Sequence, residues 1–255
     1  VFYTNNNNTQ IDLNYYISMN IIVMKFGGTS VASIEKLQNI AKIVVGEVKR
    51  NKVIVVLSAI AGETNKLQTY LDNFKSQNSL ESDLVLTSGE QVTIGLLSLA
   101  LKNDGIKSIP LLGWQIPIIT DDNHEKAKIL QIDSKRIHKY FENNDVIVLA
   151  GFQGVNVDGK ITSLGRGGSD TTAVAIASSV KAERCDIYTD VDGVYTTDPR
   201  IAEKARKVNR ISFEEMLELA SLGAKVLQTR SVELAMRYKV KLRVLSSFEE
   251  PRGNA

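Results

Sequence analysis

Residues 23–33, VMKFGGTSVAS, place a lysine and two glycines between an apolar run and the start of a helical pattern. The apolar run, IIVMK at 21–25, is typical of a strand buried on both faces of a sheet. The pattern over 33–49 has apolar residues at the spacing of one helix face. Two glycines let backbone N–H groups approach phosphate oxygens, and the following helix N-terminus adds positive charge. The lysine precedes the glycines, so the stretch is neither a P-loop nor G-x-G-x-x-G. The alternative is a tight strand-to-helix turn with a solvated lysine and no role in binding.

The rest of the chain continues the alternation of strand and helix. Buried strands are expected within 53–59, 145–154 and 184–195 and over 241–247, and helices over 89–105, 169–182, 212–220 and 229–240. Ser169 or Asp170 is the expected N-cap of the helix over 169–182. Ser212 with Glu215 forms a capping box at the start of the helix over 212–220. Two prolines within 106–122 suit a sheet edge or a small lid hairpin. This order predicts an α/β fold, a three-layer αβα sandwich around a mainly parallel sheet.

Composition excludes several classes of protein. The chain has 255 residues and a net charge of +2 without a dense Lys/Arg block, which argues against a nucleic-acid partner. No apolar stretch approaches the ~20 residues that cross a bilayer, so no membrane role is expected. The single cysteine cannot form an internal disulfide, which favours a cytoplasmic location. With two histidines and one cysteine, a His/Cys metal site is close to excluded.

The first 18 residues differ from the rest of the chain. They are rich in Asn and Tyr, carry one charge, and lack the basic start and apolar centre of a signal peptide. We expect Met19 to be the natural start, preceded by a non-native or disordered extension over 1–18 of cloning or start-site origin. One catalytic domain is then expected over 19–248, with a C-terminal tail over 249–255.

Four polar clusters follow the predicted strands. They are Lys25–Ser30, Ser58–Thr64, Phe152–Gly154 and Thr189–Tyr195. Parallel strands end at one edge of their sheet, and ligands bind beyond that edge. We therefore expect these clusters to form one site.

Two further motifs carry charged residues beside glycine or proline turns. In SLGRGGSDTT (163–172), Arg166 is suited to grip a carboxylate and Asp170 to bind an ammonium, although a capped helix after a flexible loop is the alternative. In YTDVDGVYTTDPR (188–200), carboxylates and tyrosines suit ribose and base, although Asp-Gly and Asp-Pro turns are the better explanation when this motif is taken alone. Glu90 begins a helix, where simple capping is the alternative to a binding role. Cys185 is expected in the core, and His124 and His138 are assigned no chemistry.

Together these motifs resemble aspartokinases, which are members of the amino acid kinase family. The resemblance covers Met19 to Ser247 and rests on KFGGTSV, LTSGEQ, GFQG, LGRGGSDTTA, YTDVDGVYTTDPR and SFEEMLELASLGAKVL, in that order. It implies the amino acid kinase fold and transfer of the γ-phosphoryl of MgATP to the side-chain carboxylate of L-aspartate. The product is 4-phospho-L-aspartate, the entry to lysine, threonine and methionine synthesis.

The resemblance also implies roles, position by position. The catalytic residues are Lys25, Asp170 and Lys225. The aspartate site comprises Ser58, Thr64, Glu90, Phe152, Arg166 and Ser169. The ATP site comprises Lys25, Gly27, Gly28, Ser30, Thr189, Asp190, Tyr195, Arg200 and Lys225. Mg²⁺ is held mainly by the ATP phosphates, and no protein metal site is expected.

The chemistry agrees with these assignments. A carboxylate with a pKa of ~3.9 is ionised at neutral pH, so the acceptor needs no general base. Positioning and positive charge must then bring the aspartate carboxylate close to the negatively charged phosphates of ATP. Arg166 is assigned to the α-carboxylate of aspartate, and Glu90 with Asp170 to its α-ammonium. Asp170 is also placed to hold Lys25, and the sequence does not separate the two roles.

Aspartokinases usually continue into paired ACT regulatory domains, whereas the sequence stops near the point where they begin. Feedback inhibition is therefore not carried over, and a homodimer is one assembly that the resemblance allows. The rival interpretations are an amino acid kinase with another acceptor and a nucleotide-binding module without turnover. Arg166 with Glu90 favours a zwitterionic amino acid over a nucleotide acceptor.

Overall fold

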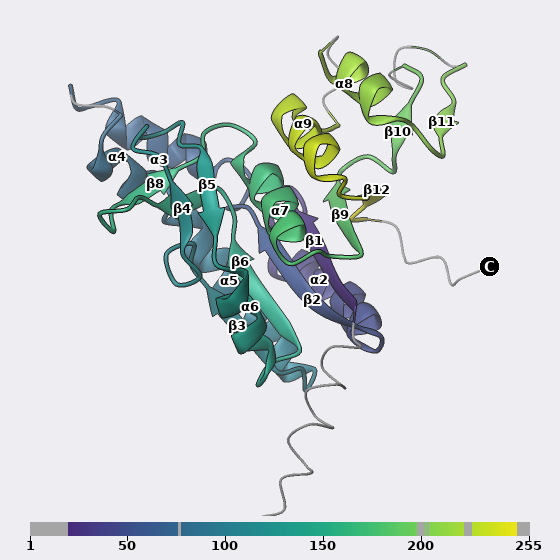
Figure 1. Ribbon diagram of the computed structural model, residues 1–255, viewed down its shortest axis with the longest axis horizontal. Coiled ribbons are helices and arrows are strands. Elements are labelled where there is room, and N and C mark those ends of the chain that lie inside the picture. The colour runs from purple at the N-terminus through teal and green to yellow at the C-terminus, as the bar shows by residue number, and fades with distance from the viewer. Residues whose placement is uncertain (1–19, 76–77, 198–201, 203, 222–225, 249–255) are drawn as a thin grey trace, which may run out of the picture.

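A six-stranded parallel sheet forms the centre of the protein (Figure 1). The computed structural model describes residues 20–75, 78–197, 202, 204–221 and 226–248. The strands lie in the order β12-β9-β1-β2-β6-β3, and every neighbouring pair is parallel. Their bounds are Asn20–Phe26 for β1, Asn51–Leu57 for β2, Ser108–Leu111 for β3, Val146–Ala150 for β6, Arg184–Thr189 for β9 and Leu242–Ser246 for β12. The predicted mainly parallel sheet is confirmed.

Helices cover both faces of this sheet (Figure 1). On one face, α2 (Ile34–Val48) packs beside α5 (Gly89–Asn103). The other face carries α6 (Ser134–Phe141), α7 (Gly168–Ser179) and α9 (Thr229–Tyr238), with α8 (Phe213–Ser221) against α9. The three-layer αβα architecture is therefore confirmed.

The alternation of side chains along β1 sends its residues into two separate cores. Ile22, Met24 and Phe26 lie in the core under α2 and α5. Val23 lies in the opposite core, which includes residues of α7 and α9. Because successive side chains of a strand point to opposite faces, Lys25 projects toward the α7 side.

A smaller four-stranded sheet lies beyond the edge of the central sheet. It has the order β5-β4-β7-β8, in which β4–β7 is parallel and the outer pairs are antiparallel. The bounds are Ile118–Thr120 for β4, Ile129–Ile132 for β5, Gln153–Val155 for β7 and Ile161–Ser163 for β8. Segment 106–122 was expected to form a sheet edge or a lid hairpin; it supplies the edge strand β3 and then β4.

Several short elements were not predicted from the sequence. They are β5, β8, α3 (Glu63–Leu71), α4 (Leu80–Leu86), α6, and an antiparallel pair formed by β10 (Val194–Tyr195) and β11 (Lys207–Val208). The expectation that no apolar stretch approaches the length of a membrane span is wrong by length and composition. The stretch Leu80–Asn103, which contains α4 and α5, is long and apolar enough to cross a membrane, but half of its apolar window is buried inside the fold. Its apolar character is explained by the packing of α5 against α2 and the sheet.

One predicted cap is confirmed and another is wrong. The Ser212 N–H donates to the Glu215 carboxylate, and the Glu215 N–H donates to Ser212 Oγ, as the capping box requires. By contrast, neither Ser169 nor Asp170 is the N-cap of α7. The cap is Gly167, whose left-handed φ of +73° turns the chain into the helix without a side-chain bond. Ser169 and Asp170 lie inside the first turn, where both are buried.

We predict that Phe26→Ala lowers the free energy of unfolding by about 3–5 kcal/mol, because it leaves a cavity in a close-packed core. Phe26 is fully buried at the end of β1 and stacks on Tyr188 of β9, with ring centroids 4.4 Å apart. Urea unfolding measures the change. Phe74→Ala is the control, because Phe74 is 67% exposed and its truncation should change stability by less than about 0.5 kcal/mol. Equal losses in the two variants would contradict the packing assigned to Phe26.

Candidate active site

The site lies where β1, β2, β6 and β9 end at one edge of the sheet. After β1 the chain enters α2 on one face, whereas after β9 it continues to α8 and α9 on the other. Strands that are followed by connections to opposite faces leave a crevice between them, which is the usual binding position in open α/β sheets. The four polar clusters expected at this edge all follow these strands.

The Gly27–Gly28 turn is held against the loop that follows β2. A Cβ on Gly28 would lie 2.8 Å from the carbonyl oxygen of Ala59, so a side chain there would force the two segments apart. The Ala61 N–H donates to the Gly28 carbonyl at 3.1 Å, and the Ser30 N–H closes the turn on Gly27 at 3.0 Å. A Cβ on Gly27 would lie 3.4 Å from Lys25 Nζ. The glycine turn and the lysine ammonium are therefore neighbours.

Lys25 forms a buried ion pair with Asp170. Lys25 Nζ lies 2.7 Å from Asp170 Oδ1, and the two side chains are 12% and 11% exposed. The direction of Lys25 follows from the alternation along β1, and Asp170 comes from the first turn of α7 on the same side of the sheet. In this arrangement Asp170 holds the ammonium at the carboxyl end of β1.

Glu90 places a second carboxylate at this edge, and only one of its two oxygens accepts a hydrogen bond from a described residue. Its Oε1 accepts a hydrogen bond from the Ala59 N–H at 3.1 Å. Its Oε2 is buried and accepts no hydrogen bond from any residue that the structure describes. The residue is 2% exposed, and burial raises its pKa to about 7. A buried carboxylate oxygen without a donor is suited to a cationic ligand such as an ammonium.

The loop after β6 passes between β2 and the start of α7. A Cβ on Gly151 would lie 2.9 Å from both the Leu57 carbonyl and Ser169 Oγ. Phe152 adopts a left-handed φ of +69°, which is uncommon for a non-glycine residue. Its N–H donates to Thr172 Oγ1 of α7 at 3.2 Å. Phe152 and Ser169, both predicted in the aspartate site, are thereby brought together.

The remaining residues predicted for the aspartate site lie on two loops and at the start of a helix at the same edge. Ser58 directly follows β2 and is half-buried, and its carbonyl accepts from Thr93 Oγ1 of α5 at 2.9 Å. Thr64 is the second residue of α3 and is half-buried. Arg166 is exposed between Gly165 and Gly167, both with φ of +73°. Its side chain is exposed to solvent at the entrance to α7.

The residues predicted to bind ATP form a second group at the ends of β9 and β12. Ser30 Oγ donates to Ser247 Oγ at 2.8 Å, and Ser247 Oγ donates to the Thr189 carbonyl at 3.0 Å. Thr189 Oγ1 donates to the carboxylate of Asp190, which is exposed. Ser30 is 2% exposed, so its hydroxyl serves to join the glycine turn to the two strand ends.

Tyr195 lies on β10, in the small antiparallel pair beyond β9. Its hydroxyl donates to Asp192 at 2.9 Å, and Lys207 of β11 lies 3.0 Å from the same carboxylate. The hydrogen bond from Lys207 lowers the pKa of Asp192. Arg200 and Lys225, the other two residues predicted for the nucleotide site, lie outside the described residues, as do segments 1–18 and 249–255.

Sequence reasoning missed two groups that bear on this site. The Ala59 N–H is the donor to Glu90, but a backbone donor has no signature in residue type. His124 was assigned no chemistry, yet its Nδ1 lies 2.6 Å from Oδ2 of the fully buried Asp83. The two residues are 41 positions apart, so no local pattern connects them.

Comparison with known proteins identifies the family. Residues 20–246 match the model of the amino acid kinase family. The chain belongs to the amino acid kinase family.

Within the amino acid kinase family, the proteins to which the chain is similar include curated aspartokinases. The chain is 54% identical over 235 residues to the aspartokinase of Rickettsia felis, covering 90% of this chain and 59% of that protein. It superposes on the aspartate kinase of Synechocystis with a TM-score of 0.79 and 42% identity, covering 91% of this chain and 39% of that one. Escherichia coli aspartokinase III, solved in complex with aspartate and ADP, gives a TM-score of 0.79 and 28% identity, with 92% and 63% covered. The chain therefore spans about three fifths of the length of the curated relatives it matches.

The raised pKa of Glu90 predicts a fall in stability as the pH rises. Its pKa is about 7 in the folded protein against an ordinary 4.5, so the folded state keeps a proton that the unfolded chain has lost. The stabilisation is complete below pH 4.5 and is lost as the pH passes about 7. A pKa difference of this size corresponds to about 3 kcal/mol. Urea unfolding of the ligand-free protein between about pH 5 and 8 should show the loss, and Glu90→Gln should reduce it.

The control for this measurement is Glu142→Gln, because Glu142 is exposed at the end of α6. It should leave the pH dependence of stability unchanged. An equal pH dependence in wild type and Glu90→Gln would show that Glu90 is ionised at its ordinary pKa in the folded protein.

Proposed function

We propose that this protein is an aspartokinase, which transfers the γ-phosphoryl of MgATP to the β-carboxylate of L-aspartate. The observation that carries the proposal is the pairing of an anion-binding group with a cation-binding group at one sheet edge. The first is Lys25 beside the Gly27–Gly28 turn, and the second is Glu90 Oε2, which has no donor among the described residues. ATP offers its phosphates to the first, and aspartate offers its α-ammonium to the second. The names of the similar proteins support the same substrate.

The geometry supports a division of labour among the predicted residues. Lys25 neutralises charge on the transferring phosphoryl group, and Asp170, 2.7 Å from its ammonium, orients it between turnovers. Glu90 binds the α-ammonium of aspartate, and Arg166 pairs with its α-carboxylate in a bidentate manner. Ser58, Thr64, Phe152 and Ser169 line the aspartate site.

The nucleotide occupies the side of the site formed by the ends of β9 and β10. Gly27 and Gly28 contact the phosphate chain, while the segment from Thr189 to Tyr195 holds the nucleoside, together with Ser30, Arg200 and Lys225. Mg²⁺ enters with ATP as part of the substrate, and Lys225 assists the transfer. In this proposal the enzyme is cytoplasmic, supplies lysine, threonine and methionine synthesis, and assembles as a homodimer.

The acceptor needs no proton removed from it, because a carboxylate is already the nucleophile. This fits a site whose described residues at the sheet edge include no histidine. Catalysis then rests on bringing two anions together under fixed positive charge. A buried lysine and backbone N–H groups supply that charge without reorganising during the reaction.

The test is ADP release from MgATP by the purified protein, with hydroxylamine added to trap an acyl phosphate as the hydroxamate. We expect ADP release that depends on L-aspartate, together with aspartyl hydroxamate. Lys25→Ala should lower kcat by about 100-fold or more, because the transition state loses a preorganised charge. Lys42→Ala is the control, because Lys42 is exposed on α2. ATP binding without aspartate-dependent ADP would favour a nucleotide-binding module, and a hydroxamate with another acceptor would favour a different kinase of the family.

We predict that Arg166→Lys raises the KM for aspartate by about 10-fold or more and leaves the KM for ATP nearly unchanged. Lysine keeps the charge but loses the planar pair of donors that a carboxylate accepts. Steady-state kinetics with each substrate varied in turn measures the two constants. An unchanged KM for aspartate would remove Arg166 from the aspartate site.

A further inference from the structure

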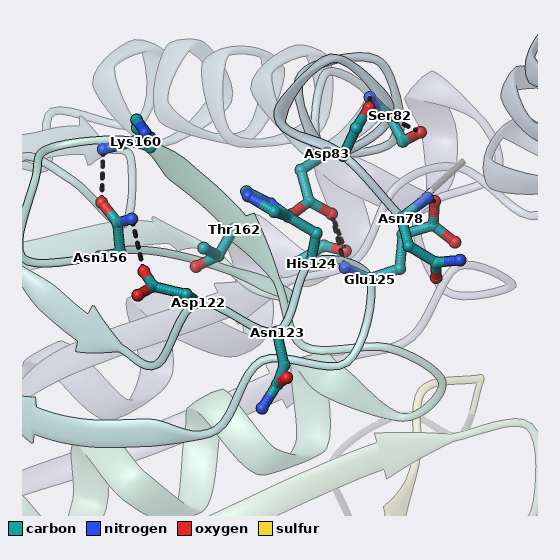
Figure 2. A network of polar contacts seen from close by, with 12 residues as sticks. Asn78, Ser82, Asp83, Asp122, Asn123, His124, Glu125, Asn156, Lys160 and Thr162 are labelled. Carbon is teal, nitrogen blue, oxygen red and sulfur yellow. Dashed lines mark hydrogen bonds and ion pairs between the residues drawn. The ribbon is translucent and has the colours of Figure 1, made fainter. Parts of the chain in front are cut away.

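Asp83 gathers three hydrogen-bond donors in the interior of the protein, away from the ends of the central strands. It lies on α4 and is fully buried. Its Oδ2 lies 2.6 Å from His124 Nδ1, and its Oδ1 accepts from the Glu125 N–H at 3.0 Å and from Ser163 Oγ at 2.5 Å. Figure 2 shows the carboxylate of Asp83 directed at the loop that carries His124 and Glu125. The carboxylate thus joins three segments that are distant in sequence.

The loop bearing His124 and Glu125, residues 121–128 between β4 and β5, is itself fixed by polar contacts. Asp121 Oδ1 accepts from the Asn123 N–H and the Lys128 N–H. Glu125 has a left-handed φ of +61°, and its Oε1 accepts from the Asn78 N–H at 2.7 Å. Such a conformation costs free energy in a residue other than glycine and persists only where surrounding contacts hold it.

This loop contacts the segment Ser163–Gly165, which immediately precedes Arg166. The Ala127 N–H donates to the Ser163 carbonyl at 2.9 Å. A Cβ on Gly165 would lie 2.8 Å from the carbonyl oxygen of Glu125, so only glycine permits this approach. Asp83 therefore holds the segment Ser163–Gly165 in two ways: directly through Ser163 Oγ, and indirectly through the loop that supports Gly165.

The other side of the same segment is held by the aspartate site and by α9. The Leu164 N–H donates to the Phe152 carbonyl at 2.8 Å, and Arg230 Nη1 donates to the Leu164 carbonyl at 2.8 Å. Arg166 comes next in the chain, and its side chain is exposed to solvent. Its position depends on the residues just before it, and these depend on Asp83.

We propose that Asp83 and His124 are positioning residues for the reaction: they fix Ser163–Gly165 and thereby place Arg166 for the substrate carboxylate. The effect on the substrate rests on the proposed function. A buried carboxylate is stable only while its donors are in place. The network is therefore sensitive to the loss of one donor, and the loss acts on the segment next to Arg166.

The experiment compares three variants of the full chain. His124→Leu removes the ring donor. His124→Asn keeps a side-chain N–H close to the position of Nδ1. His138→Leu is the matched control, because His138 is the second of the chain's two histidines and is exposed on α6. Each variant is examined by peptide-resolved amide hydrogen exchange and by kinetics with aspartate and ATP varied separately.

For His124→Leu we expect faster exchange in the peptides spanning the His124 loop and Ser163–Gly168, with exchange in β1 and β2 unchanged. We also expect a KM for aspartate about 10-fold higher, and a KM for ATP within about twofold of wild type. His124→Asn should restore both properties toward wild type, and His138→Leu should change neither. A purely structural role would instead lower the active fraction and reduce kcat with both substrates alike.

Exchange that is unchanged in Ser163–Gly168, or raised throughout the protein, would overturn the proposal. An active His124→Leu variant with an unchanged KM for aspartate would do the same. If His124→Leu does not fold, Ser163→Ala removes a different donor to Asp83 and must give the same local exchange and the same selective rise in KM. The exchange result does not depend on activity, so an inactive wild-type protein would refute the proposed function and leave the structural part of the inference tested.

Discussion

The ion pair between Lys25 and Asp170 is the contact on which the arrangement of the site depends. It joins Lys25, the penultimate residue of β1, to Asp170 in the first turn of α7. The ion pair therefore connects a central strand to a helix that covers one face of the sheet. Its geometry follows from the pleat: with Met24 and Phe26 committed to one core, Lys25 must project into the other layer. An ammonium at this position is costly to bury without a partner, and Asp170 is the partner that the fold provides.

Glu90 and Asp170 show how one sheet edge keeps two acids in different states. Asp170 has a cation within 2.7 Å. Glu90 has one backbone donor, and its Oε2 has no donor among the described residues; burial raises its pKa to about 7. The first acid is paired with a cation of the protein, and the second is left for a cationic ligand. This asymmetry is achieved with backbone geometry, because Gly89 and Ala59 permit the close contact that encloses Glu90.

The parts of the fold that could be predicted from the sequence are those encoded by long local patterns. The strands β1, β2 and β6 each contain an apolar run of four or more residues, and α2 has a regular apolar face, so their order predicted the sheet edge that carries the site. Strands of three or four residues, such as β4 and β8, are too short to show a period. They form because each pairs with β7, which lies between them in the smaller sheet.

The failures at the site have similar causes. Ser169 and Asp170 carry good N-cap side chains, but the left-handed Gly167 starts α7 and leaves both side chains to face inward. The link from Asp83 to His124 spans 41 positions and is created by tertiary packing alone. Residue type indicated where a charge could act, whereas the contacts that hold each charge depended on chain segments brought together by the fold.

Cys185 lies on β9 of the central sheet, paired with Val23 of β1 on one side and Leu242 of β12 on the other. It is fully buried, burial raises the pKa of its thiol, and it is the chain's single cysteine. Its side chain belongs to the core that the sheet shares with α7 and α9, so this core must open before a reagent reaches the sulfur. The rate of thiol alkylation therefore reports the opening of the core between the sheet and these helices, and the protein carries an intrinsic label for the integrity of the layers on which its site is built.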